Sequence, residues 1–306
     1  MNCFKKSCIS FNKPIFIWGM PRGGTTILHD FLYLSDDLAS FNIKKNRLKK
    51  GIWGDLHYGE NIPDILKSIS SPIEGFPRVW FDTNAYSNFL KQKHSKRDQI
   101  KVFKQIKKIE QEWFFKTTYK KKRILEKSPN YVMILELVNK LFPNSLHICV
   151  LRDPRAVVNS FARLIKNSPK TTGKVLRKGD TILRFNGYEK ISNLPTYEIF
   201  SWQMEKILEY SDAFKKKVNG RLSFWYHENI YEDLPYYLKK LTKRLDIEFP
   251  KLIKYFTSEY IEKNYPWWRN EKLKKDPFYT NFLTDREIST LKRLDVLSKK
   301  MGYDEN

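Results

Sequence analysis

Residues 14–34 read PIFIWGMPRGGTTILHDFLYL, and this stretch decides the fold. Its first part, residues 14–19, is a short apolar run typical of a buried parallel strand. A glycine-rich turn follows, and residues 25–34 then carry apolar side chains at helical spacing. A strand, a glycine-rich turn and a helix in this order are the elements with which many α/β proteins hold phosphate groups.

The turn has the spacing of a phosphate-binding loop, G-x-x-x-x-G, between Gly19 and Gly24. Glycines let the backbone wrap around an anion, and the N–H groups that begin the next helix point toward it. Thr25 stands where an ATP-binding loop carries lysine, so the cation is expected from Arg22. Spacing alone also allows an ordinary strand-to-helix turn. We predict that this loop is a cofactor-binding segment, formed by Pro21, Arg22, Gly23, Gly24, Thr25 and Thr26.

The alternation of strand and helix continues along the chain. Further strands are predicted at residues 123–126, 145–151 and 221–229. Further helices are predicted at residues 129–140, 152–165, 202–217 and 236–245, and the polar region 166–193 is expected to be a loop. This pattern predicts one α/β domain over residues 1–306. The expected architecture is a P-loop-like three-layer fold, in which helices flank a central, mainly parallel β-sheet.

A second phosphate site is indicated where the predicted strand of residues 145–151 ends. Arg152 lies at its carboxyl edge, Asp153 can cap the following helix, and Pro154 suits the first turn. Ser160 falls about two turns into that helix, so a guanidinium and a hydroxyl can grip one phosphate together. A surface arginine and an unrelated serine are the alternative that these residues leave open.

Together the two motifs resemble those of sulfotransferases that use 3'-phosphoadenylyl sulfate, above all the tyrosylprotein and bacterial group. Residues 19–26, GMPRGGTT, are similar to the family's 5'-phosphosulfate loop, G-x-P-R-S-G-T-T, with Gly23 in place of serine. The family's 3'-phosphate motif is an arginine followed eight residues later by a serine, and residues 152–160 resemble it. The resemblance implies that Arg152 and Ser160 bind the 3'-phosphate.

The resemblance extends more weakly to three other segments. Residues 126–129, EKSP, look like the lysine-containing segment that precedes the 3'-phosphate strand, which implies a catalytic role for Lys127 beside Arg22. Residues 225–228, WYHE, are similar to the family's R-Y-E-D strand end, which implies that Tyr226 belongs to the nucleotide site. Residues 301–303, MGY, match its usual L-G-Y ending.

The catalytic base is left open by these motifs. In relatives a glutamate often follows the first helix within G-E-L or G-E-E, and residues 54–58, GDLHY, look like G-E-L with aspartate for glutamate. Asp55 is therefore the first choice for a general base. His57, Glu60 and Glu74 stand behind it.

The amino-acid composition limits which classes of protein and of partner are possible. Hydrophobic residues make up 41% of the 306 residues and aromatic residues 15%, which is typical of a globular chain. The formal net charge of +23 favours an anionic partner, although a lysine-rich surface explains it equally well. No apolar run reaches the roughly 18 residues of a membrane span. Three cysteines without a CxxC pair favour a reducing, cytoplasmic setting and no metal site.

The resemblance implies a metal-independent sulfotransferase with 3'-phosphoadenylyl sulfate (PAPS) as donor substrate. The acceptor is expected to be a hydroxyl or amine of a glycan, a peptide or a small molecule, and no specific nucleic-acid partner is expected. Two alternatives remain. One is a P-loop nucleotide kinase or related NTPase, and the other is a non-catalytic basic protein that binds polyanions.

Overall fold

The structure, a computed structural model, describes residues 13–39, 123–133, 135–158, 160, 183, 185–194, 196–250, 296 and 299–301. The five strands found there form one sheet in the order β2-β3-β1-β4-β5, and every neighbouring pair is parallel. The strands are β1 (Ile15–Gly19), β2 (Leu38–Ala39), β3 (Arg123–Lys127), β4 (Leu146–Leu151) and β5 (Leu222–Tyr226).

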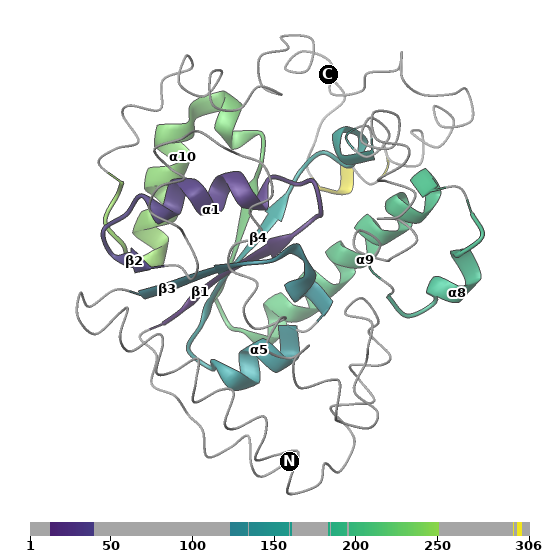
Figure 1. Ribbon diagram of the computed structural model, residues 1–306, viewed down its shortest axis with the longest axis horizontal. Helices are drawn as coiled ribbons and strands as arrows, with labels where there is room; N and C mark the ends of the chain where they lie inside the picture. The colour runs from purple at the N-terminus through teal and green to yellow at the C-terminus, as the bar shows by residue number, and fades with distance from the viewer. Residues whose placement is uncertain are drawn as a thin grey trace, which may run out of the picture.

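Helices follow the strands, as a parallel sheet requires of its crossover connections. They are α1 (Thr25–Tyr33), the 3-10 helix η4 (Pro129–Met133), α5 (Leu135–Leu141), α8 (Tyr188–Ile191), α9 (Thr196–Lys217) and α10 (Asn229–Leu245). Residues 154–158 are also helical. Figure 1 shows α1 and α10 on one face of the sheet and α5 and α9 on the other. The predicted three-layer α/β architecture is therefore confirmed.

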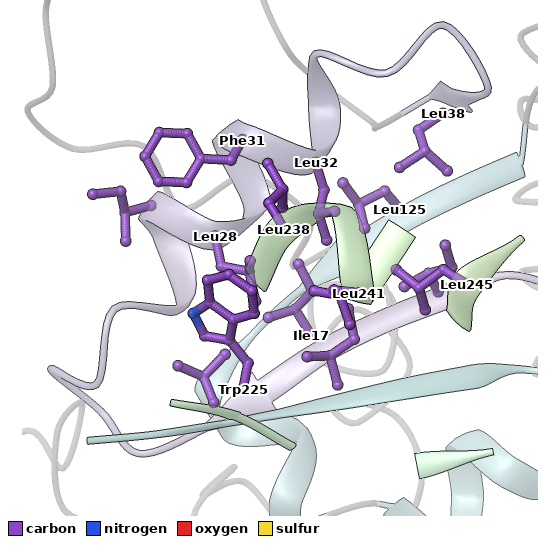
Figure 2. Close-up of a cluster of buried hydrophobic side chains, with 14 of the residues drawn as sticks. Ile17, Leu28, Phe31, Leu32, Leu38, Leu125, Trp225, Leu238, Leu241 and Leu245 are labelled. Atoms are coloured by element: carbon purple, nitrogen blue, oxygen red, sulfur yellow. The ribbon is translucent and has the colours of Figure 1, made fainter. Parts of the chain in front are cut away.

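The core on the face of α1 and α10 follows from strand alternation, because every second residue of β1 points to the same side. Ile15 and Ile17 face this layer and are fully buried. Figure 2 shows the apolar side chains of both helices gathered over the strands, with the Trp225 ring of β5 beneath them. The helical members of this cluster include Leu28, Phe31, Leu32, Leu238, Leu241 and Leu245.

The alternate residues of β1 build the second core. Phe16 contacts the rings of Tyr131 and Phe142, with a centroid separation of 5.4 Å in each pair. Trp18 meets Phe214 of α9 edge to face at 6.0 Å. Aromatic rings in these tilted and edge-on arrangements add attraction beyond the apolar area that they bury. With both faces covered, β1 is a central strand whose five residues are all buried.

The strand register brings the predicted phosphate motifs to one edge of the sheet. Ile17 of β1 is paired with Lys127 of β3, and Gly19 is paired with Val150 of β4. Leu151 of β4 is in turn paired with Tyr226 of β5. Because the strands are parallel, the segments that leave β1, β3, β4 and β5 all begin at the same carboxyl edge, where open α/β sheets bind ligands.

The sequence placed most elements correctly, and the departures have local causes. The helix predicted at residues 129–140 begins instead as η4 and continues as α5. The strand predicted to reach residue 229 ends at Tyr226, where a turn leads directly into α10. That helix has a break at Asp233, whose carboxylate accepts a hydrogen bond from the Tyr236 backbone N–H at 3.0 Å. The part beyond the break matches the predicted helix, and the part before it was missed.

Two predictions concern the whole chain, namely that it has no membrane span and that it forms one domain. Among the described residues no helix is both long enough and apolar enough to cross a membrane. A single domain over residues 1–306 stays a prediction. The α8 helix and its neighbours fall in the predicted loop 166–193, of which the rest lies outside the described residues.

The α10 layer provides a test of the core. Replacing Leu238, which is fully buried, by alanine should lower the free energy of unfolding by about 2–5 kcal/mol, because the cavity is enclosed by α1 and the sheet. Urea denaturation followed by circular dichroism measures this. The matched control is Tyr236→Ala on the same helix, where the side chain is 57% exposed and the expected change is within about 0.5 kcal/mol. Equal losses in both variants would contradict the assigned core.

Candidate functional site

The loop between β1 and α1 is tied to β4 by its backbone. The Met20 N–H donates to the Val150 carbonyl at 3.1 Å, and the Gly23 N–H donates back to the Met20 carbonyl at 2.8 Å. Gly19 has a φ of +138°, and a Cβ at this position would lie 2.1 Å from the Val150 oxygen. Only glycine permits both the backbone conformation and this close approach. The first glycine of the predicted loop is thus required by the contact between two strands.

The loop ends at Gly24, which is the N-cap of α1 with a φ of +94°. The Leu28 N–H donates to the Gly24 carbonyl at 3.2 Å and closes the first turn of the helix. In any α-helix the N–H groups before this point have no partner within the helix and carry the positive end of its dipole. Thr25 is buried and Thr26 is half-buried beside them. This geometry suits an anion held by backbone N–H groups.

Gly23, where the resembled motif has serine, sits in a tight turn. A Cβ at this position would lie 2.7 Å from the Met20 carbonyl oxygen. In this chain the loop closes more tightly than a serine would allow without a shift of Met20. The exchange of serine for glycine therefore has a physical reason here.

The two predicted phosphate motifs meet through their arginines. The Arg22 Nε donates to the Ser160 Oγ at 3.2 Å, and the Arg152 Nη1 donates to the Arg22 carbonyl at 3.1 Å. Arg22 lies more than a hundred positions before both Arg152 and Ser160 in the chain. Arg22 is exposed and adopts a φ of +65°, an unusual conformation for a residue with a side chain. Two guanidinium groups and one hydroxyl therefore lie next to the loop.

The helix that follows Arg152 begins as predicted. The Asp153 Oδ1 accepts a hydrogen bond from the Arg155 backbone N–H at 2.9 Å, which is an N-cap interaction. The Arg155 side chain also pairs with the Asp153 carboxylate, with a distance of 2.8 Å between Nη2 and Oδ2. The Asp153 carboxylate is thus directed toward its own helix.

Lys127 ends β3 on the other side of β1. Its side chain is buried, and the Ser128 N–H after it donates to the Ile17 carbonyl at 3.0 Å. The preceding acid, Glu126, accepts a hydrogen bond from the Tyr131 hydroxyl at 3.0 Å. Lys127 thus stands at the carboxyl edge, one strand away from the phosphate loop.

A carboxyl group that the sequence interpretation missed, Asp30 on α1, lies within electrostatic range of Lys127. Burial raises the pKa of the Asp30 carboxyl, while the hydrogen bond and charge of His29 and the charge of Lys127 oppose that rise. The distance between Asp30 Oδ1 and His29 Nδ1 is 3.2 Å. The signal in the sequence was an acid inside an otherwise apolar helical stretch. Such an acid is solvated on most helices, so the pattern alone did not single it out.

The end of β5 and the turn after it bring Tyr226, His227 and Glu228 to the carboxyl edge of the sheet. Tyr226 is half-buried, and burial raises the pKa of its hydroxyl. His227 is buried next to Gly24, and its pKa is lowered well below the usual value by burial and by the positive charge of Arg152. Its imidazole is therefore neutral at physiological pH. The Glu228 Oε1 accepts a hydrogen bond from the Asp153 N–H at 3.1 Å.

The four candidates for the catalytic base, Asp55, His57, Glu60 and Glu74, lie outside the described residues. Within the residues that are described, no group of three or more His, Cys, Asp and Glu side chains is arranged to hold a metal ion. Cys149 is buried in β4, and burial raises the pKa of its thiol to about 12. Cys149 therefore belongs to the core.

Comparison with known proteins assigns a family. A model of the sulfotransferase family matches residues 14–191, which is more than half of the chain. A search of curated proteins finds no match.

Several solved structures are similar at low identity. The sulfotransferase domain of the Synechococcus PCC 7002 olefin synthase is 18% identical, with 78% of this chain and 74% of that one covered and a TM-score of 0.44. Sulfotransferase STF9 from Mycobacterium avium is 14% identical, with 94% and 76% covered and a TM-score of 0.45. The assignment of the family rests on the match over residues 14–191.

The contact between Gly19 and β4 can be tested by substitution. Gly19→Ala should lower the free energy of unfolding by several kcal/mol, because the methyl group meets the Val150 backbone as well as an unfavourable φ. Gly220→Ala is the matched control, since Gly220 also has a positive φ, +79°, but has open space around it. Its expected cost is only about 1–2 kcal/mol. Urea denaturation of both variants checks this, and similar costs would argue against the close contact.

Proposed function

The chain belongs to the sulfotransferase family, and we propose that it transfers a sulfuryl group from PAPS to a hydroxyl or amine acceptor. The observation that carries this proposal is the pair of hydrogen bonds that joins Arg22, Ser160 and Arg152. They join the predicted 5'-phosphosulfate loop to the predicted 3'-phosphate motif. A donor with phosphate groups at both ends of its ribose suits a site with these two neighbouring parts.

Charge supports the same proposal. The guanidinium groups of Arg22 and Arg152 both lie beside this loop, and an anion bound there is attracted to both. Arginine also recognises phosphate with paired hydrogen bonds. In the proposed complex, Arg152 and Ser160 bind the 3'-phosphate, while Arg22 and the N–H groups at the start of α1 bind the 5'-phosphosulfate. Pro21, Gly23, Gly24, Thr25 and Thr26 shape that loop, and Tyr226 lines the nucleotide side.

In the proposed reaction the acceptor atom attacks sulfur in line with the bond to the 5'-phosphate oxygen. That bond breaks, 3'-phosphoadenosine 5'-phosphate leaves, and the acceptor proton passes to a base. Arg22 and Lys127 would stabilise the negative charge that develops on the leaving and peripheral oxygens, because preorganised cations at such a site lower the barrier. Asp55 remains our first candidate for the base. A glycan, a peptide or a small molecule is the proposed acceptor, and a cytoplasmic location is proposed as well.

The kinase alternative is disfavoured by two features of the site. A P-loop kinase needs a loop lysine for the phosphates and an acidic residue for Mg²⁺. Here Thr25 replaces that lysine, and the Asp153 carboxylate is paired with Arg155. The formal net charge of +23 is the observation that favours a polyanion-binding role. It does not account for the contact between Arg22 and Ser160.

The donor site is tested by calorimetry with 3'-phosphoadenosine 5'-phosphate in the absence of metal, and with ATP plus Mg²⁺. We expect tight binding of the first and little binding of the second. Ser160→Ala should weaken binding of the bisphosphate about tenfold through loss of a hydrogen bond to a charged group. Ser192→Ala is the control, because Ser192 is an exposed serine near α8. Preference for ATP with Mg²⁺ would favour the kinase. Binding of polyanions alone would favour a non-catalytic polyanion-binding protein.

The proposed role of Lys127 predicts a loss in rate rather than in affinity. Lys127→Met should lower kcat by about a hundredfold or more, since a charge-stabilising donor is removed, with a much smaller change in donor affinity. Initial rates with labelled PAPS and an acceptor found by screening measure this, and thermal unfolding verifies that the variant is folded. Lys190→Met, on the exposed side of α8, is the control. An unchanged kcat would remove Lys127 from the mechanism.

A further inference from the structure

The turn that follows β5 is held against both phosphate motifs. The His227 N–H donates to the Leu151 carbonyl at 2.8 Å, which extends the pairing of β5 with β4 by one residue. The Ile230 N–H donates to the His227 carbonyl at 3.1 Å and closes the turn into α10. With its backbone fixed on both sides, the turn presents two adjacent side chains at the edge of the sheet.

The first of them, His227, lies against the phosphate loop. A Cβ built on Gly24 would be 2.2 Å from the His227 Nδ1 and 2.7 Å from its Cε1. The imidazole therefore occupies the space that a side chain at position 24 would need. It is buried, and it stays neutral because burial and the charge of Arg152 disfavour its protonated form. A neutral ring of this size supports the loop without adding a third positive charge.

The second, Glu228, acts on the other motif. Its Oε1 accepts a hydrogen bond at 3.1 Å from the N–H of Asp153, the residue directly after Arg152. The Asp153 carboxylate is occupied with Arg155, as described above. The backbone on which Arg152 stands is therefore held from outside its own helix, by the turn after β5.

We propose that His227 and Glu228 are positioning residues for the two phosphate groups of the donor, one residue for each group. His227 supports the loop that is proposed to bind the 5'-phosphosulfate. Glu228 holds the backbone that carries Arg152 toward the 3'-phosphate. This inference rests on the proposed function, because it assigns each side chain to one part of the same donor site.

The division of roles predicts a signature that a general loss of stability does not produce. A defect in the loop should weaken every adenosine 5'-phosphate to the same degree. A defect at Arg152 should weaken only nucleotides that carry a 3'-phosphate. The ratio between the dissociation constants of adenosine 5'-phosphate and 3'-phosphoadenosine 5'-phosphate therefore separates the two effects.

The experiment measures both dissociation constants by calorimetry for the chain of 306 residues and its variants. Glu228→Ala should reduce the ratio about tenfold, since one hydrogen bond that orients Arg152 is lost. Glu228→Gln keeps an acceptor oxygen and should restore most of the ratio. His227→Ala should weaken both nucleotides by a similar factor, about tenfold for a displaced loop, and His227→Gln should recover part of that loss. Glu232→Ala is the matched control, because this exposed acid on α10 contacts Tyr237.

The outcomes distinguish the inference from the function on which it rests. If the unaltered chain binds both nucleotides equally or binds neither, the proposed donor site is wrong and the inference falls with it. If the unaltered chain prefers the bisphosphate but Glu228→Ala keeps the ratio, the inference alone is overturned. It is also overturned if Glu228→Gln loses as much as Glu228→Ala. Should Glu228→Ala fail to fold, Glu228→Gln and both His227 variants still decide. A tenfold loss of the ratio in Glu228→Gln, or a changed ratio in either His227 variant, contradicts the assigned roles.

Discussion

The close packing of β1 against β4 at their carboxyl ends is the contact on which the site depends. Gly19 has no side chain, so its backbone can lie against Val150, and the next residue donates its N–H to the Val150 carbonyl. The loop after β1 and the segment after β4 therefore leave the sheet side by side. The hydrogen bond from Arg152 to the Arg22 carbonyl is a direct consequence of this proximity. A bulkier residue at position 19 would push the two segments apart, so their side chains could no longer meet at one site.

The distribution of charge at the carboxyl edge of the sheet follows from this close approach of the two segments. Two arginines and a buried lysine lie near one helix N-terminus, so the edge is positive before any anion arrives. Around them the protein places groups that add no positive charge, namely the neutral ring of His227 and the hydroxyl of Ser160. Two of the nearby acids have partners of their own, since Glu126 accepts a hydrogen bond from Tyr131 and Asp153 pairs with Arg155, whereas Asp30 lies within electrostatic range of Lys127. Cationic side chains from β3, from the loop after β1 and from the segment after β4 thus gather at one edge of the sheet.

Much of the fold could be predicted because each element has a strong local signal. The apolar run of residues 14–19 is too short for a helix and is followed at once by a glycine-rich turn, so a buried strand was the natural interpretation. The cap at Asp153 and the proline after it predicted where a helix begins, and the structure has this cap. The missed elements have weak signals. The strand β2 has only two residues, and the first turns of α10 contain a break at Asp233 and a proline at position 235.

The sequence by itself determined the order of strands and helices, the phosphate-loop pattern and the residue types that suit an anionic donor. These properties depend on local spacing, such as the separation of five residues between Gly19 and Gly24. Only the tertiary structure decided which distant residues meet: that Arg22 reaches Ser160, that Asp30 lies near Lys127, and that the turn after β5 contacts both motifs. The physical reason is that parallel strands bring segments far apart in the chain to one edge. Which of them become neighbours depends on strand order and register, and those are set by packing over the whole sheet.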